Sequence, residues 1–472
     1  LGDVYKRQIL ETSAFHILLF RWSDFLTSDS KVFQVDVTGV CLKSQTKYKI
    51  KQESTLNNQI EQQNLELLEQ YFRDGCKWNC LQKLGVELEH FVIDRKNQKN
   101  VSYYGPDGIE ELLEEWKEYY PGHERENGRL LGLYNNDYAL SLEPAAQLEI
   151  SMAPKESLRC IEKIYRNFSE AVRPSLERRG YELVTRGYRP FGRVDELDLI
   201  PKKRYEYMDA YFQESGTTGR NMMRGTAAAQ VSIDYCCEQD FISKYRTAYL
   251  IMPALKLLSD NTAVLEEKPY PGHLARTWIW DHVDSGRCGI LPGIFEEDFG
   301  FHTYAEYLWN LELIFLPEDG GYRSTGHQKV RDLWSDRLLT RQDMEHILSM
   351  TFLDVRVKHY VEIRGADSMP LPYVLAYTAL VKGLTFEKEV REELLARYPI
   401  QEEDIRKAER SLAEQGYEGE IYGEPAAAFI GRLLQMAEDH LEPEERKYLQ
   451  PLSELVQRKE SLKEQERQEV WK

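Results

Sequence analysis

Five glutamates in segments that alternate polar and apolar residues are the part of this sequence best suited to chemistry. Each lies in or at the end of an expected strand: Glu87, Glu89, Glu143, Glu149 and Glu362. Glu87 and Glu89 stand two residues apart, so a strand would point both to one face with their origins ~7 Å apart. A single alternating glutamate usually marks a solvated face. Because glutamate is depleted in strands, its repetition over several strands favours a shared function.

If these strands are neighbours, the carboxylates repel one another unless cations bind or the carboxyl pKa values rise. The set contains neither histidine nor cysteine, and ligation by oxygen alone suits Mg²⁺ or Mn²⁺. Magnesium often bridges a few carboxylates to nucleotide phosphates. The sequence contains neither the P-loop pattern nor the dinucleotide-binding fingerprint. A nucleotide would therefore be held mainly through metal ions and strand side chains.

Other polar residues share the faces of the expected strands. In "YVEIRGAD", residues 360–367, Glu362 and Arg364 alternate with apolar residues and point to one face. In "TAAAQVSIDYC", residues 226–236, Gln230 and Ser232 also alternate with apolar residues and point to one face. These strands would add hydrogen-bond donors and a positive charge to the carboxylates.

Arginines beside aromatic residues suggest a second kind of contact. Arg276 and Arg287 flank Trp280 in "RTWIWDHVDSGRCGILP", and Arg224 precedes the strand with Gln230. Such arginines either pack on the surface or clamp a carboxylate through two parallel hydrogen bonds. The residues alone leave both interpretations open.

The elements that must position these residues can be read from periodicity. Strands separated by helices, several with strict alternation, favour an α+β fold around an antiparallel sheet. The segment 261–330, rich in Gly, Pro, Trp and His, suits binding loops. The expected strands are 84–94, 138–144, 146–151, 226–236 and 359–367, and the expected helices are 56–72, 108–120, 154–180, 239–260, one ending near 385, 402–415 and 426–441.

We expect three parts along the chain. The first methionine is Met152, and the opening "LGDVYKRQ" resembles a translated sequencing adapter. Residues 1–55 are therefore expected to be an uncertain, partly artefactual segment. Residues 56–385 would form the catalytic domain, and residues 386–472 a charged helical C-terminal region.

Composition narrows the possible partners. The 472 residues carry a formal net charge of −18, which argues against nucleic acid because phosphate backbones are gripped by basic patches. No apolar run reaches the ~20 residues that span a bilayer, so no membrane partner is expected. Seven cysteines without paired spacing favour a reducing compartment, and we expect a cytoplasmic protein. The oligomeric state is left open.

Five ordered motifs connect the chain to a known family: "GVELEHFVI", "LEPAAQLEIS", "MMRGTAAAQVSIDY", "RTWIWDHVDSGRCGILP" and "YVEIRGADSMP". Over residues 60–385 the chain resembles the glutamate–cysteine ligases, in the branch shared by plants and many bacteria. That family belongs to the glutamine synthetase-like carboxylate–amine ligases. The resemblance implies an active site on a curved antiparallel β-sheet that holds ATP and magnesium, surrounded by helices.

The resemblance also implies roles for particular residues. Metal ligands would be Glu87, Glu89, Glu143, Glu149, Glu362 and Gln230. Residues that bind ATP would be Arg364, Gln230 and Ser232, with Arg364 and Glu362 taking part in catalysis. Residues that bind the amino-acid substrates would be Arg276, Arg287, Trp280, Arg224 and Thr226.

The implied reaction joins the γ-carboxylate of glutamate to the amine of cysteine through γ-glutamyl phosphate, consuming ATP. The product would be γ-glutamylcysteine, the first intermediate of glutathione biosynthesis. Gly225 stands where plant members have arginine, and Ser232 where they have asparagine, so another amine acceptor is an alternative. A non-catalytic nucleotide- or metal-binding protein is the other.

Overall fold

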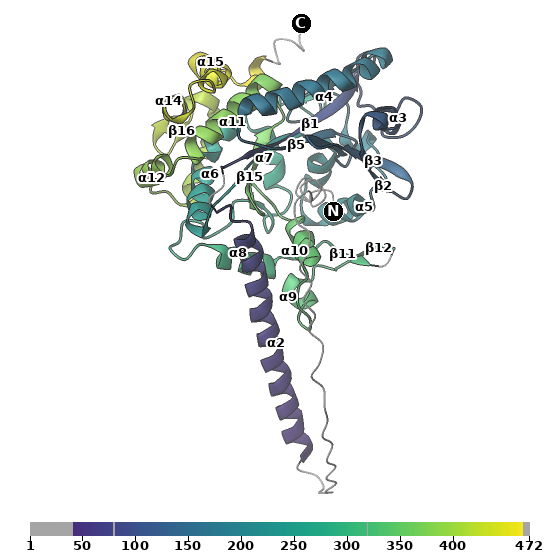
Figure 1. Ribbon diagram of the computed structural model, residues 1–472, viewed down its shortest axis with the longest axis vertical. Helices are drawn as coiled ribbons and strands as arrows, with labels where there is room; N and C mark the ends of the chain where they lie inside the picture. Colours follow the sequence, from purple (N-terminus) through teal and green to yellow (C-terminus); the bar gives the residue numbers. More distant parts are fainter. Residues whose placement is uncertain (1–40, 79–80, 319, 466–472) are drawn as a thin grey trace.

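In the computed structural model, residues 41–78, 81–318 and 320–465 are described, with side chains from residue 57 onward. Residues 1–40, most of the segment expected to be uncertain, lie outside this description. The centre of the molecule is a nine-stranded sheet with the order β14-β15-β7-β1-β5-β4-β3-β2, in which β6 also pairs with β1 (Figure 1). Every pairing in it is antiparallel. The predicted α+β fold around an antiparallel sheet is confirmed.

The strands of this sheet include all those expected from the sequence. Their bounds are β1 (Leu84–Asp94), β2 (Gly122–Glu126), β3 (Arg129–Tyr134), β4 (Tyr138–Leu142), β5 (Leu148–Lys155), β6 (Tyr181–Val184), β7 (Ala228–Ile233), β14 (Val355–Val357) and β15 (Val361–Asp367). Smaller pairs are β8 (Val264–Leu265) with β9 (Lys268–Pro269), β10 (Cys288–Gly289) with β13 (Phe352–Leu353), β11 (Phe315–Glu318) with β12 (Gly321–Ser324), and β16 (Glu420–Ile421) with β17 (Glu424–Pro425).

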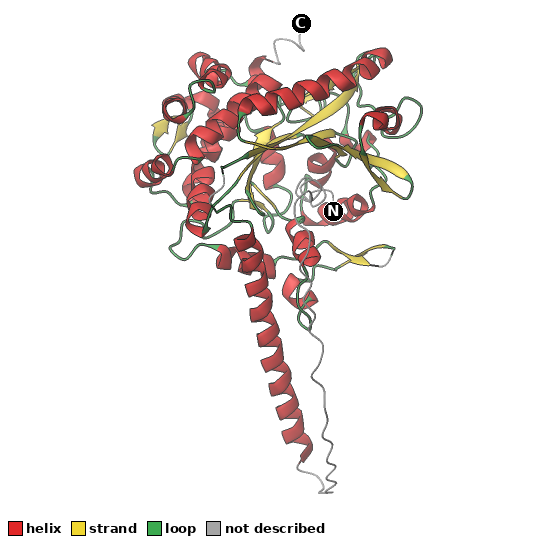
Figure 2. Cartoon of the chain, in the orientation of Figure 1, coloured by secondary structure: helices red, strands yellow, loops and turns green. Residues whose placement is uncertain are grey.

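The helices surround the sheet (Figure 2). They are α2 (Cys41–Asp74), α3 (Ile109–Trp116), α4 (Leu158–Arg179), α5 (Lys203–Ser215), α6 (Glu238–Leu258), α7 (Ala275–Asp281), α8 (Phe301–Asn310), α9 (Val330–Leu333), α10 (Arg341–Leu348), α11 (Leu371–Thr385), α12 (Lys388–Arg397), α13 (Glu402–Gln415), α14 (Ala426–His440) and α15 (Gln450–Arg458). Helix α2 extends out of the body and packs beside α8 near its C-terminal end (Figure 1). No described helix is both long and apolar enough to cross a bilayer.

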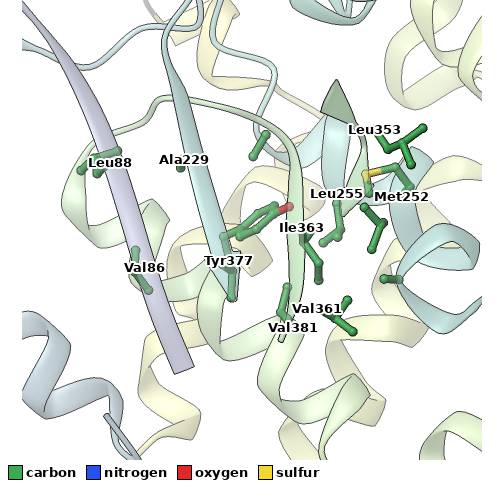
Figure 3. Packing of buried hydrophobic residues seen from close by; sticks show 14 of the residues in the cluster. Val86, Leu88, Ala229, Met252, Leu255, Leu353, Val361, Ile363, Tyr377 and Val381 are labelled. Atoms are coloured by element: carbon green, nitrogen blue, oxygen red, sulfur yellow. The ribbon is translucent and has the colours of Figure 1, made fainter. Parts of the chain in front are cut away.

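The sheet has one apolar face, on which the core is built. Val86 of β1 lies opposite Val231 of β7, which in turn lies opposite Ile363 of β15, and directly opposed residues of an antiparallel pair share a face. Figure 3 shows these strands packed against Met252 of α6 and Tyr377 of α11. Helices α6, α11 and α4 therefore cover this face, and the opposite face is left for the polar residues of the same strands.

The C-terminal helices continue the same core. Helices α12 and α13 pack on α6, and α14 and α15 pack on α11. One hydrophobic cluster runs from Leu68 to Leu462. The expectation of a helical C-terminal region is confirmed, and it is packed into the body that carries the sheet.

The segment 261–330 departs from the prediction of binding loops. It contains α7, α8 and the hairpins β8–β9 and β11–β12. These elements span at most ten residues, so the local periodicity was too brief to reveal them. Strands β2 and β3 were missed as well, because β2, "GHERE", has no apolar alternation.

Candidate active site

A row of polar side chains crosses the second face of the sheet. Glu362 of β15 lies opposite Ser232 of β7, and Gln230 of β7 lies opposite Glu87 of β1. Glu89 of β1 lies opposite Glu149 of β5. We call Glu87, Glu89, Glu149 and Glu362 the carboxylate row. The structure brings together on one face the strand glutamates that alternation had selected.

Glu89 lies at the centre of this row and is buried. It accepts a hydrogen bond from the backbone N–H of Ala228 at 2.8 Å and one from Gln230 Nε2 at 3.3 Å. Burial, followed by the negative charges of Glu143 and Glu149, raises the pKa of Glu89 well above its usual value. Glu143, which directly follows β4, is therefore close enough to act as the fifth carboxylate of the site.

Two serine hydroxyls contact Glu149. Its side chain is 3% exposed and accepts hydrogen bonds from Ser141 Oγ at 3.0 Å and Ser151 Oγ at 2.8 Å. Both serines belong to the polar face of β4 and β5. The two hydroxyls orient the carboxylate and add no charge of their own.

Glu362 carries its charge among cations. Arg356 Nε lies 2.6 Å and Arg364 Nη1 3.2 Å from Glu362 Oε2. Burial raises the pKa of Glu362, but Arg356, Lys358 and Arg364 outweigh it and lower the pKa to about 2. Arg364 also donates to Gln230 Oε1. Arg364 therefore bridges β15 and β7 at one end of the row.

Arg276 and Trp280 of α7 reach the same site. The Arg276 guanidinium lies 5.3 Å from the centre of the Trp280 ring and donates to the carbonyl oxygen of Arg364 at 3.3 Å. Burial lowers the pKa of Arg276, and the charges of Asp367 and Glu89 oppose this. Its Nε is buried without a hydrogen-bond partner among the described residues. Arg276 thus has an unused donor, and its contact with a substrate stays a prediction.

The structure gives Arg287 a different place from the predicted one. Its guanidinium is 1% exposed and donates to Asp284 at 2.7 Å and to the carbonyl oxygens of Met350 and Glu312 at 3.1 and 2.7 Å. It also donates to Tyr211 Oη. These bonds tie three loops together. We therefore correct the substrate-binding role predicted for Arg287 to a structural one.

Arg224 and Thr226 are also engaged with the protein. Arg224 pairs with Asp209 at 2.8 Å, and Thr226 Oγ1 donates to the carbonyl oxygen of Met222 at 2.6 Å. Both lie around the short π-helical turn that precedes β7. Their observed contacts shape the wall beside β7, and contact with a substrate stays a prediction for both.

Asp367 is a site residue that alternation missed. It accepts hydrogen bonds from the Asn261 N–H at 3.0 Å and from Thr262 Oγ1 at 2.8 Å, and burial, followed by Asp260, raises its pKa to about 7. Strict alternation from Glu362 would point an odd-numbered residue to the apolar face. A register shift between Ile363 and Ala366 reverses the order and puts Asp367 opposite Ala228, on the polar face.

Gly365 makes this shift possible. A Cβ at this position would lie 2.5 Å from the sulfur of Met252, closer than real Cβ contacts. The backbone of β15 therefore comes directly against α6 at the bulge. The glycine was visible in the sequence, but the neighbour it accommodates was not.

The donor set suits a hard divalent cation. The row offers carboxylate and amide oxygens alone, and the carboxylates of Glu143 and Glu149 raise the pKa of Glu89, a repulsion that a cation relieves. Among the described residues, no three His, Cys, Asp or Glu side chains are already gathered as metal ligands. The chemistry fits the predicted cation, whereas its coordination stays a proposal.

Comparison with known proteins identifies the family of the chain. Residues 83–469 match the model of glutamate-cysteine ligase family 2. The chain belongs to glutamate-cysteine ligase family 2. The match confirms the resemblance and extends it beyond residue 385 through the C-terminal helices that share the core.

Relatives in this family include chloroplastic glutamate–cysteine ligases of plants. The chain is 30% identical over 333 residues to the one of Brassica juncea, covering 69% of this chain and 64% of the relative. It is 31% identical over 328 residues to ligase B of Oryza sativa subsp. japonica, covering 68% of this chain and 65% of the relative. The chain thus spans somewhat less than two thirds of these relatives' length.

Among solved structures, the glutamate–cysteine ligase of Francisella tularensis in complex with AMP is similar at a TM-score of 0.47 and 11% identity. The similarity covers 82% of this chain and 84% of that one.

Proposed function

We propose that this protein is an ATP- and Mg²⁺-dependent ligase that joins the γ-carboxylate of L-glutamate to the amine of L-cysteine. The product is γ-glutamylcysteine, formed through γ-glutamyl phosphate, as the first step of glutathione biosynthesis. Family membership and the names of the relatives support this. The observation that carries the proposal is the juxtaposition of the carboxylate row with Arg364 on one face of the sheet.

The first half-reaction transfers the γ-phosphoryl group of ATP to the γ-carboxylate of glutamate. Such transfers ask the protein mainly for positioning and charge stabilisation. Bound magnesium, for which Mn²⁺ is a substitute, supplies neutralisation of the phosphate charge. The residues that would hold it are Glu87, Glu89, Glu143, Glu149, Glu362 and Gln230.

Arg364 is fixed for the same step by its contacts with Gln230 and Glu362. A guanidinium held in place stabilises charge that develops on the transferred group without reorganising. Ser232, next to Glu362 in the register, lines the same end of the row. Together they form the phosphate end of the site.

The second half-reaction displaces phosphate with the amine of cysteine. Arg276 has an unsatisfied buried Nε and lies beside Glu89 and Asp367. We assign it to the α-carboxylate of glutamate, which a guanidinium binds through two parallel hydrogen bonds. Trp280, stacked on Arg276, restricts the guanidinium to that orientation.

Release of ADP from magnesium-ATP, with glutamate and with or without cysteine, tests the proposal. We expect release that depends on cysteine and a product with the mass of γ-glutamylcysteine. Release that depends on glutamate but not on cysteine would point to another amine, for which a panel of acceptors is the next measurement. Binding of ATP without any release would favour the non-catalytic alternative.

We also propose a cytoplasmic location, in a reducing environment. Five described cysteines, Cys76, Cys160, Cys236, Cys237 and Cys288, are free thiols. Fractionation of the cells that produce the protein would test this, and recovery from an oxidising compartment or an organelle would contradict it.

A further inference from the structure

A cavity of about 1240 Å³ opens at the end of the carboxylate row that lies opposite Arg364. Ser141, which donates to Glu149, lines one side of it, and the β2–β3 hairpin lines another. The first turn of α5 and the turn between β11 and β12 complete its walls. A ligand in this cavity would reach the row past Ser141.

The charged residues around the mouth of this cavity are almost all paired. Glu124 lies 3.6 Å from Lys202 Nζ, and Glu126 accepts the backbone N–H of Lys203 at 2.9 Å. Glu206 forms an ion pair with the side chain of Lys203. The carboxylates of the wall are therefore committed to other partners.

Arg204 is the exception. It lines the cavity, yet among the residues that the structure describes no carboxylate lies within ion-pair distance of its guanidinium. Its Nε is buried without a hydrogen-bond partner in the same part of the chain. The guanidinium lies 5.9 Å from the centre of the Tyr205 ring. This contact involves the face of the guanidinium and leaves the N–H groups of the guanidinium unused. A half-buried guanidinium whose N–H groups are not taken by a carboxylate suits an anion supplied by a ligand.

Lys202 increases the positive potential around Arg204. Lys202 is 7% exposed, and its distance to Glu124 exceeds that of a hydrogen bond. The N-terminus of α5 is not counted with it, because the first backbone N–H, that of Lys203, already donates to Glu126.

We infer that Arg204, together with Lys202, binds an anionic group of a substrate whose reacting end lies at the carboxylate row. A guanidinium suits a carboxylate or a phosphate through paired hydrogen bonds. Within the proposed function, on which this inference rests, the anion is the carboxylate of one of the two amino acids or a phosphate of ATP.

The test compares the parent chain with R204Q and R204K. Dissociation constants are measured by calorimetry for magnesium with a non-hydrolysable ATP analogue, and then for glutamate and cysteine in its presence. We expect R204Q to weaken one of these by about 10- to 100-fold, because a hydrogen-bonded charge pair is lost. R204K restores part of the loss, since lysine keeps the charge but not the planar fork. R397Q, which removes an exposed arginine at the end of α12, is the matched control and leaves all three constants unchanged.

The ligand whose constant changes identifies the anion. Parent-like constants for all three ligands in R204Q, with turnover intact, would overturn the inference and leave the proposed function standing. An equal loss for all three together with a lower melting temperature in both Arg204 variants would overturn it too, because that pattern belongs to a structural role. Failure of the parent to bind any of the three would reject the proposed function and this inference together.

Discussion

Glu149 and Glu362 carry their charges in opposite surroundings. Glu149 is oriented by two serine hydroxyls, and Glu362 is surrounded by Arg356, Lys358 and Arg364. Replacing the first removes negative charge from a cluster that repels itself. Replacing the second leaves buried cations without their partner, which costs stability as well as function.

Both Glu149→Gln and Glu362→Gln should lower turnover by about 100-fold or more, which corresponds to about 2.7 kcal/mol of transition-state stabilisation. Glu149→Gln should do so with little change in melting temperature, whereas Glu362→Gln should lower it. Glu182→Gln, on strand β6 of the same sheet, where the side chain pairs with Arg95, is the control. Turnover within a few fold of the parent in either variant would contradict the role of the carboxylate row.

At the scale of elements, the bulge in β15 sets the direction of Asp367 and Arg364. Gly365→Ala puts a methyl group against Met252, and we expect a loss of about 1–3 kcal/mol in the free energy of unfolding together with lower turnover. Gly431→Ala in α14 has nothing within 4 Å of the added Cβ. It should stabilise the protein by about 0.5–1 kcal/mol. Denaturant unfolding of the two variants checks both signs, and equal effects would exclude the steric explanation.

A buried ion cluster links three elements behind this bulge. Lys256 of α6 lies 2.9 Å from Asp354 and 2.7 Å from Glu409 of α13. The Asp354 carbonyl oxygen accepts the backbone N–H of Arg364 at 2.8 Å. Burial, opposed by Lys256, raises the pKa of Glu409 to about 7 from a usual value of 4.5.

Because the pKa of Glu409 is raised, its contribution to stability is complete below about pH 4.5 and is lost as the pH rises through about 7. Glu409→Gln, which stays uncharged, should therefore gain stability relative to the parent between pH 5 and 7, by about 1 kcal/mol per pH unit. Urea unfolding at several pH values measures this. For Glu403→Gln, on the exposed side of the same helix, the free energy of unfolding should depend on pH as it does in the parent. The same pH dependence in Glu409→Gln as in the parent would contradict the prediction.

Periodicity predicted the helices and strands in which the same face is buried from one end to the other. The bounds of β1 and of α13 were predicted to the residue, because β1 alternates strictly over much of its length and α13 is strongly amphipathic. The direction of Asp367 was not predictable, because it depends on a contact between Gly365 and α6. Arg287 and Arg204 show the same limit. Both are arginines near aromatic residues in the sequence. Arg287 has a carboxylate partner in the fold and is structural, whereas Arg204 has none among the described residues and is a candidate for binding. The sequence does not show this difference.

At the scale of the whole molecule, the C-terminal helices and the sheet share one core. Gly383 of α11 approaches Ala437 of α14 so closely that a Cβ would lie 2.7 Å from its Cα. We expect one calorimetric unfolding transition for the chain, at the temperature at which ligase activity is lost. Leu433→Ala, at a buried position of α14, should leave a single transition and lower the free energy of unfolding by about 2–5 kcal/mol. A separate transition for the helices with activity retained would show an independent domain.

The use of both faces of the sheet has a consequence for insertions and deletions. Adding one residue inside β1 or β7 would exchange the faces of every residue beyond it, moving glutamates into the core and aliphatic side chains into the carboxylate row. Length changes should therefore be tolerated in exposed connections away from the cavity, such as the turn 95–97 after β1, and rejected inside the central strands. Strand β15 already contains one such register shift, and the residue at the shift is Gly365, which has no side chain to place against α6.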